Sequence, residues 1–226
     1  MARLKRDAAE HAVSLVESGM VVGLGTGSTA IFAIRRISEL LASGTLRDIT
    51  GVPTSAASAS AAQRLGVPLL DREWAGAIDI TIDGADEVDP SLDLIKGGGG
   101  ALLREKIVAQ SSRREVIVVD ETKLSPRLGT WWPVPVEVIP FGWRAQSEFV
   151  ASLGAVVSLR ANVEGQPVET DNGNYVLDCA FGPIADVPAL AERLAGRAGI
   201  VEHGLFVGLA TDLIVAREGG IEHRVR

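Results

Sequence analysis

The stretch T-I-D-G-A-D-E-V-D-P-S-L-D-L-I-K-G-G-G-G-A-L-L-R-E-K-I-V-A-Q, residues 81–110, decides how this chain folds. A β-branched run at 78–82 predicts a buried strand that ends in acidic residues. A lysine, four consecutive glycines and a helical segment follow. The groups that can carry chemistry are Asp83, Asp86, Lys96, Gly97–Gly100 and Glu105. Loops at strand ends are where α/β proteins place ligands, so the stretch predicts an active site as well as a fold.

Short apolar runs alternate with helical segments through the first half of the chain. Strands are expected at 20–24, 49–53, 67–70, 78–82 and 116–119, and helices at 8–18, from the glycine turn to about 43, at 56–65 and at 101–110. Strands that alternate with helices favour a parallel sheet with helices on both faces. This half therefore predicts an α/β domain.

The pattern changes near residue 130, where tryptophans and prolines cluster. Trp131 and Trp132 precede a proline-rich extended segment that ends at Pro140. The elements expected after it are helix 143–153, strand 156–159, strand 175–179, helix 188–195 and a strand near 200–201. Together they give the β-α-β-β-α-β order of a ferredoxin-like unit. The tail, 205–225, returns to short apolar strands that are expected to rejoin the first sheet.

Charge and cysteine content exclude several classes of protein. The 226 residues carry a net charge of −7, which argues against nucleic acid as a partner. Cys179 is the only cysteine, so no intrachain disulfide can form and a reducing, cytoplasmic setting fits. The first residues lack the apolar core of a signal peptide. No run reaches the roughly 20 apolar residues that cross a bilayer, so no membrane partner is expected.

The glycine turn G-L-G-T-G-S-T, residues 23–29, opens a predicted helix. A dinucleotide fingerprint needs a third glycine where Ser28 stands, so a nicotinamide or flavin site is not favoured. Thr26, Ser28 and Thr29 offer hydroxyls, and glycines let free N–H groups approach an anion. The turn therefore predicts a phosphate site, with an N-capped helix as the alternative.

The acidic loop raises the question of a metal. Its carboxylates suit Mg²⁺ or Ca²⁺, but Val88 and Leu94 occupy positions where an EF-hand loop needs glycine and glutamate. The histidines at 11, 203 and 223 are too scattered to indicate zinc. We expect Glu87 and Asp89 to lie in a solvated loop, whereas Asp83 and Asp86 should face a ligand crevice.

Lys96 directly precedes the four glycines, which indicates backbone packed closely against a neighbour rather than a flexible connector. A lysine here can stabilise negative charge on a substrate oxygen. Lys123 follows another predicted strand end. Its side chain either reaches a phosphate in the same crevice or is exposed, and the residues alone leave both possibilities open.

Glu105 has only apolar neighbours at helical spacing. These are Ala101, Leu102, Val108 and Ala109. A partly desolvated carboxylate has a raised pKa, which suits a general base. Arg104 has similar neighbours, so a helix buried on all sides is the alternative.

These motifs resemble those of the A-type ribose-5-phosphate isomerase family. The resemblance covers nearly the whole chain, in family order: 23–29, D-G-A-D-E at 83–87, K-G-G-G-G-A-L-L-R-E-K at 96–106, 120–123, P-V-P-V-E-V-I-P at 133–140, T-D-N-G-N at 170–174 and 204–206. It implies a Rossmann-like catalytic domain at 1–130 and 205–226, and a small α+β domain at 131–204 used in oligomer contacts. A homodimer or homotetramer follows only from this resemblance.

The resemblance also implies the reaction and its residues. The family interconverts D-ribose 5-phosphate and D-ribulose 5-phosphate in the pentose phosphate pathway, without a metal or organic cofactor. Glu105 is the implied proton acceptor. The chemistry of this reaction suits Lys96 and the glycine-turn amides to stabilise the enediolate charge, and either Asp83 or Asp86 to shuttle the hydroxyl proton and help open the sugar ring. The implied substrate-binding set is Thr26, Gly27, Ser28, Thr29, Asp83, Gly84, Ala85, Asp86, Lys96, Gly97, Gly98, Gly99 and Lys123, with Lys5 as the best match for a phosphate-contacting lysine.

Two other classes share parts of this pattern. An amino-sugar phosphate deaminase or a CoA-transferase would share the fold and a site glutamate, but the paired D-G-A-D-E and K-G-G-G-G motifs favour the isomerase. A sugar-phosphate sensor is the non-enzymatic alternative. Such regulators usually carry a DNA-binding segment, which this acidic chain is not expected to hold before Met20.

Overall fold

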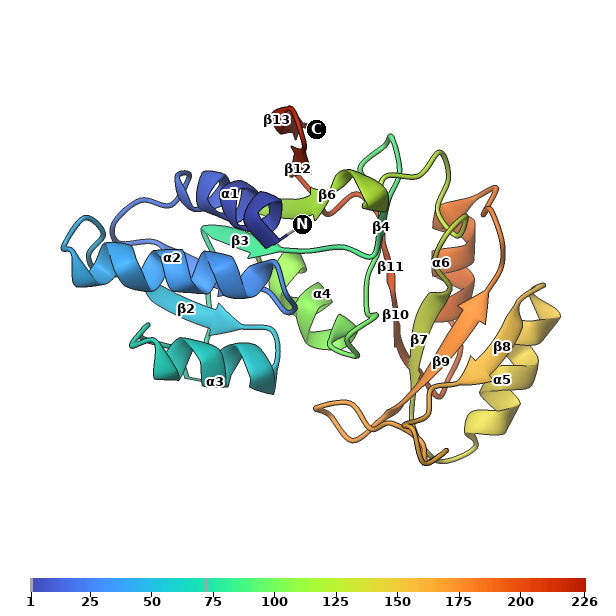
Figure 1. Cartoon of the computed structure of the whole chain (residues 1–226). Coiled ribbons are helices and arrows are strands. Elements are labelled where there is room, and N and C mark those ends of the chain that lie inside the picture. Colours follow the sequence, from blue (N-terminus) through green and yellow to red (C-terminus); the bar gives the residue numbers. More distant parts are fainter. Residues whose placement is uncertain (1, 72) are drawn as a thin grey trace. The chain divides into compact units, whose positions relative to one another are not determined.

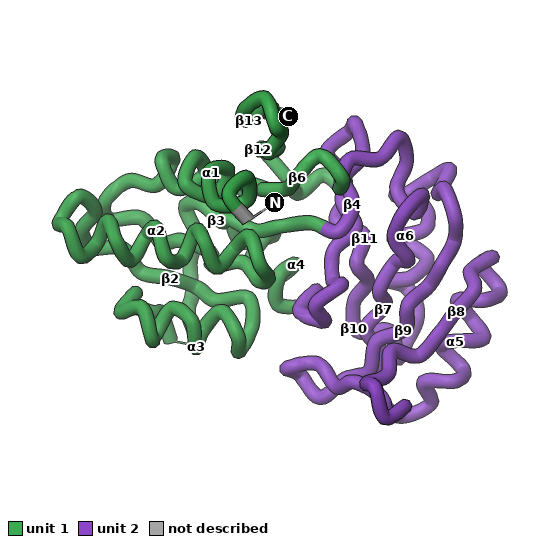
Figure 2. Tube along the Cα trace, viewed as in Figure 1, with its two compact units in different colours: residues 1–85, 104–123, 208–226 green, residues 86–103, 124–207 purple. Residues whose placement is uncertain are grey.

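A computed structural model describes residues 2–71 and 73–226, and these residues divide into two compact units. The first unit comprises 1–85, 104–123 and 208–226, and the second comprises 86–103 and 124–207 (Figure 2). The chain therefore leaves the first unit and returns to it twice. Each unit has its own sheet and its own apolar core.

The first unit is built on a six-stranded sheet in the order β13-β12-β6-β3-β1-β2 (Figure 1). Its strands are β1 Val21–Leu24, β2 Thr50–Pro53, β3 Ile80–Asp83, β6 Glu115–Asp120, β12 Asp212–Arg217 and β13 Gly220–Val225. All neighbours pair in parallel except β12 and β13. The α/β class and the parallel sheet are as predicted. The predicted tail, 205–225, joins this sheet only from Asp212, since residues 205–206 pair in the second unit.

Helices cover both faces of this sheet. They are α1 Ala2–Val13, α2 Ala30–Ala42, α3 Ala56–Arg64 and α4 Leu102–Gln110, with the 3₁₀ turn η1 Glu121–Lys123. One face packs Val22 and Leu24 of β1 against α1 and α2. On the other face, Val108 of α4 packs against Val52 and Ile78. Burial on both sides explains why the strands read as continuous apolar runs.

The chain changes direction across the sheet between β1 and β3. From β1 it passes through α2 to β2 on one side, whereas β3 lies on the other side of β1 and leads on to β6. The carboxyl ends of strands at such a switch point leave a crevice for ligands. The two loops that start there are the glycine turn after β1 and the acidic loop after β3.

The first helix is shifted from the predicted 8–18 to 2–13, and one predicted strand is absent. The first helix ends at Val13 rather than Ser18, because the Ser14 hydroxyl bonds the His11 carbonyl and the next amides reach back only three residues. Residues 67–70 form a single bridge to Gly51 instead of a strand. Pro68 has no N–H to extend the ladder.

One buried ion pair ties β12 to the sheet. Asp212 accepts hydrogen bonds from Nε and Nη2 of Arg114 at 2.8 and 2.7 Å, from the Thr211 hydroxyl at 2.7 Å and from the His223 ring at 2.7 Å. Burial would raise the pKa of Asp212, but these hydrogen bonds outweigh it and lower the pKa to about 2. The carboxylate is only 2% exposed.

The second unit has the predicted ferredoxin-like order. Its elements are β7 Val134–Val138, α5 Trp143–Ser152, β8 Val156–Leu159, β9 Tyr175–Ala180, α6 Val187–Ala195 and β10 Ile200–His203. The strands form an antiparallel sheet in the order β10-β7-β9-β8. Val150 of α5 and Leu194 of α6 are fully buried in its core.

A three-stranded sheet completes the second unit. It joins β4 Glu87–Val88, β5 Leu94–Ile95 and β11 Leu205–Phe206 in the order β11-β5-β4. Ile95 lies in the apolar core of the second unit. Segment 86–103 therefore belongs to this unit, whereas the predicted domain ranges assign it to the catalytic domain. Those ranges, and the roles attached to them, stay a prediction.

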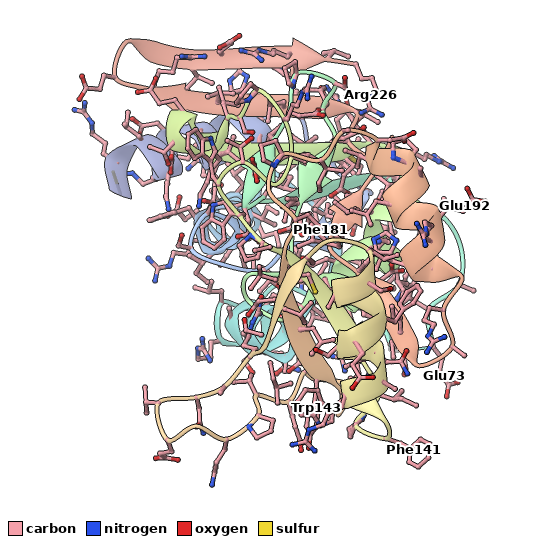
Figure 3. The ribbon with its side chains drawn as sticks, turned by 90° about the vertical axis from the view of Figure 1, so that its right-hand side faces the viewer. Glu73, Phe141, Trp143, Phe181, Glu192 and Arg226 are labelled. Atoms are coloured by element: carbon pink, nitrogen blue, oxygen red, sulfur yellow. The ribbon has the colours of Figure 1, made fainter. Side chains whose placement is uncertain are left out.

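Some large apolar side chains of the second unit face solvent. Phe141 is 88% exposed and extends from the loop before α5 (Figure 3). Trp131 is 63% exposed.

Across residues 2–71 and 73–226, every helix is too short or too polar to span a bilayer.

Candidate active site

The turn between β1 and α2 leaves its amides open. Gly27 has φ +103°, which glycine adopts without strain. Thr29 stands at the N-cap of α2, but its side chain makes no capping hydrogen bond. Within the described chain, the N–H groups of Gly27, Ser28 and Thr29 donate to no protein acceptor. Free amides at a helix start suit an anion, and the predicted N-cap alternative is absent here.

Lys5 of α1 brings a positive charge to this turn. Its Nζ lies 3.2 Å from the Ser28 hydroxyl and 3.9 Å from Oδ2 of Asp120 at the end of β6. Lys123 lies three residues beyond Asp120, in η1, with a half-buried side chain. Lys5 and the open amides thus offer a charge and donors that match a phosphate group.

Asp83 anchors the turn from the neighbouring strand. It is 1% exposed, and its Oδ1 accepts the N–H of Thr26 at 3.1 Å and that of Gly84 at 2.7 Å. A Cβ on Gly25 would lie 2.2 Å from the same oxygen, so only glycine lets β1 and β3 approach this closely here. Ala85 follows in the same loop and is half-buried.

Two residues outside the predicted site also hold the turn. The Thr26 hydroxyl lies 2.8 Å from the hydroxyls of both Thr54 and Ser55, directly after β2. Ser55 also caps α3 in a reciprocal pair with Ser58. The Thr26 hydroxyl therefore makes hydrogen bonds within the protein. A possible signal was the T-S pair at the end of the strand next to β1.

Glu105 lies in the first turn of α4, where the helix enters the first unit, and is 6% exposed. Its apolar neighbours along the helix are buried as predicted. The helix is not buried on all sides, because Ile107 is 48% exposed and Gln110 is exposed. Glu105 thus differs from an ordinary surface glutamate, which would lie on the exposed side.

The remaining predicted residues belong to the second unit. Asp86 Oδ2 accepts the N–H of Gly98 at 2.7 Å. Lys96 is 3% exposed, and its Nζ lies 5.5 Å from the centre of the Phe206 ring. Its backbone N–H donates to the Gly204 carbonyl at 2.9 Å. Gly97 is buried and Asp86 holds Gly98, so the predicted packing of the glycine loop is found in part, whereas Gly98 and Gly99 are exposed.

One family model, ribose 5-phosphate isomerase A (phosphoriboisomerase A), matches residues 50–220. The chain belongs to this family. Ribose-5-phosphate isomerase A of Chloroflexus aurantiacus is 57% identical over 219 residues, which are 97% of this chain and 92% of that protein. The enzyme of the same name from Desulfatibacillum aliphaticivorans is 54% identical over 96% of this chain and 95% of its own length.

Solved isomerase structures match the whole chain. The ribose 5-phosphate isomerase of Plasmodium falciparum has a TM-score of 0.97 at 40% identity, and the match covers 100% of this chain and 99% of that one. A D-ribose-5-phosphate isomerase in complex with phospho-erythronic acid has a TM-score of 0.96 at 40% identity, over 99% and 98% of the two chains. The family and fold class predicted from the motifs are confirmed.

One expectation about the acidic loop of this isomerase family member is wrong. Glu87 is fully buried, and its carboxylate accepts four backbone N–H groups at 3.0–3.3 Å, from Gly129 to Trp132. It therefore holds the 129–132 segment inside the second unit. Asp89 is half-buried and accepts the N–H groups of Ser91 and Asp93 at 2.8 and 3.0 Å.

The carboxylates of the loop thus accept hydrogen bonds from backbone N–H groups. Among the described residues, no group of three His, Cys, Asp or Glu side chains is arranged to hold a metal ion. The loop acquires its order from hydrogen bonds to N–H groups, which compensate buried carboxylates well.

Proposed function

We propose that this chain interconverts D-ribose 5-phosphate and D-ribulose 5-phosphate in the pentose phosphate pathway. The observation that carries the proposal lies in the first unit. That unit holds both an open amide turn suited to a phosphate and a buried carboxylate, Glu105, in a chain of the isomerase family. The wild-type chain should therefore form ribulose 5-phosphate from ribose 5-phosphate.

The phosphate is assigned to the turn between β1 and α2. The amides of Gly27, Ser28 and Thr29 donate to its oxygens, and Lys5 supplies the balancing charge, with Lys123 as a second cation. Binding energy from this remote group positions the reacting carbons. Thr26 supports the turn through its internal hydrogen bonds.

Glu105 is the base in this proposal. It removes the proton from C2 of the open-chain aldose, the C–H electron pair forms the C1–C2 double bond, and O1 becomes the enediolate oxygen. The same carboxyl returns the proton to C1, and the hydroxyl proton of O2 passes to O1, which leaves a ketone at C2. One base on one face suffices for both transfers.

The charge on the enediolate is assigned to Lys96 and to the 97–99 loop, where the Gly99 N–H has no acceptor among the described residues. Asp86 is the better candidate for moving the hydroxyl proton and opening the ring, because it is half-exposed whereas Asp83 is 1% exposed and anchors the turn. The mechanism uses no metal or organic cofactor. We also propose a cytoplasmic homodimer or homotetramer, whose contacts include exposed apolar side chains such as Trp131 and Phe141.

The test of the base is Glu105→Gln, which keeps the size of the side chain and removes its ability to take a proton. We expect a folded protein whose turnover of ribose 5-phosphate falls by at least ~10²-fold. Circular dichroism checks the fold, and the rate of ribulose 5-phosphate formation is the readout.

The matched control is Glu10→Gln, the same exchange at an exposed glutamate of α1. This control should keep the wild-type rate. Turnover in D₂O adds a second readout, since the enediolate route places deuterium on the carbon that receives the proton. Near-normal turnover of Glu105→Gln would show that Glu105 is not the base.

A further inference from the structure

Arg160, which directly follows β8, connects the glycine loop to the sheet of the second unit. Its Nη1 donates to the carbonyl oxygens of Gly97 at 2.9 Å and Gly98 at 3.1 Å. Its Nε donates to Asp178 of β9 at 3.0 Å, and its Nη2 donates to the other carboxylate oxygen. A planar guanidinium can serve such divergent acceptors at once, which an ammonium cannot.

The backbone of Arg160 is fixed as firmly as its side chain. Its backbone N–H donates to the Val176 carbonyl at 2.8 Å, and its carbonyl accepts the N–H of Val168 at 3.0 Å. Only 17% of its side chain is exposed, and 24% of that of Asp178. The pair therefore forms a fixed part of the ferredoxin-like sheet, whose strands β8 and β9 run side by side (Figure 1).

The direction of these carbonyls fixes the direction of the next amides. In a trans peptide the C=O of one residue and the N–H of the next point in opposite directions. The described chain contains no cis peptide bond. Since the Gly97 and Gly98 carbonyls point at Arg160, the N–H groups of Gly98 and Gly99 point away from it.

The two amides differ in their hydrogen-bond partners. The Gly98 N–H meets Oδ2 of Asp86 at 2.7 Å. Gly99 is exposed, and within the described residues its N–H donates to no protein acceptor. An amide with this orientation and no acceptor is available to an anionic oxygen of a ligand.

Consecutive glycines do not keep such an orientation unaided. Glycine loses more conformational freedom on ordering than any other residue. Donors stabilise a developing oxyanion best when they are already in place before the charge appears. The loop's own 97–100 hydrogen bond, at 2.9 Å, leaves its central peptides to be fixed from outside.

We propose that Arg160, held by Asp178, is a positioning residue that orients the Gly99 amide for the enediolate oxygen. This proposal rests on the isomerase activity proposed above. It assigns no substrate contact to Arg160, which acts only through the carbonyls of Gly97 and Gly98. Its loss should therefore affect the chemical step more than the binding of the phosphorylated sugar.

The test compares Arg160→Ala and Arg160→Lys with the wild-type protein. We expect kcat for ribose 5-phosphate to fall about 10- to 100-fold in both, below the loss for a deleted oxyanion donor, while KM changes less than threefold. Guanidinium ion at millimolar concentration should restore part of the kcat of Arg160→Ala and none of that of Arg160→Lys, where the lysine fills the site. The lysine variant keeps the charge and most of the packing, so it remains informative if the alanine variant folds poorly.

The matched control is Arg197→Ala in the same unit. Arg197 bonds Gln146 and packs on Phe149, with no contact to the glycine loop, and its loss should leave kcat unchanged. Unchanged kcat in both folded Arg160 variants would overturn the proposal. A joint fall of kcat and melting temperature with no rescue would also overturn it. An inactive wild-type protein would instead refute the proposed function, which separates the two failures.

Discussion

Replacing Asp212 by Asn should remove an acid-sensitive part of the stability of the first unit. The pKa of Asp212 is lowered from its ordinary value of 3.8 to about 2 in the folded chain. A carboxyl with a depressed folded pKa contributes stability that is complete above its unfolded pKa and is lost as pH falls through its folded pKa. A difference of one pKa unit corresponds to about 1.36 kcal/mol of unfolding free energy. Because Arg114 is 38% exposed, solvent screens part of this interaction, and the contribution of Asp212 at pH 7 is about 2 kcal/mol.

Urea unfolding at pH 7 and at pH 3 measures this contribution directly. The difference in unfolding free energy between wild type and Asp212→Asn should shrink by about half at pH 3, where the unfolded carboxyl is mostly protonated and the folded one is not. Circular dichroism is the signal of choice, because three of the four tryptophans, at 131, 132 and 143, lie in the second unit.

The control for this experiment is Glu222→Gln. Glu222 of β13 is 37% exposed and pairs with Arg217 of β12 and Arg224 of β13, and such exposed pairs contribute little. It should show little difference from wild type at either pH. An equal difference in unfolding free energy between wild type and Asp212→Asn at pH 7 and pH 3 would refute the lowered pKa of Asp212.

Two further predictions concern the site. Gly25→Ala should lower stability by about 1–3 kcal/mol and reduce turnover, because the added methyl would lie 2.2 Å from Oδ1 and 2.6 Å from Cα of Asp83. Urea unfolding and initial rates check it against Gly219→Ala, whose methyl meets nothing within 4 Å; equal behaviour of the two variants would contradict the close approach of β1 and β3. Dialysis against EDTA should leave the isomerase rate unchanged, whereas a collapse of the rate that Mg²⁺ restores would reinstate a metal site in the acidic loop.

Periodic features of the sequence predicted most of the fold. The alternation of apolar runs and helices gave the parallel sheet, and the β-α-β-β-α-β order after residue 130 gave the ferredoxin-like unit. These predictions succeed because burial on one or both faces leaves a repeating pattern along the chain. The glycine turn at 23–29 was found for a similar reason, since close backbone approach demands glycine at fixed positions.

The contacts that order the loops left no such pattern. Glu87 looked like one acid among several, because its partners are four backbone N–H groups, which every non-proline residue carries. Arg160 and Asp178 lie more than 60 residues from the glycines that Arg160 orients. Thr54 and Ser55 contact Thr26 only because β1 and β2 are neighbours. Such pairings depend on the tertiary fold, so local sequence cannot indicate them.

The strand order of the first unit has a consequence for how the protein is made. A ribosome releases β6 early and β12 only after the whole of the second unit, yet these two strands are neighbours inside one sheet. The nascent first unit therefore carries an unpaired β6 edge while the ferredoxin-like unit emerges and folds. An exposed apolar strand edge invites pairing with another chain, so this interval is when chaperone protection matters most.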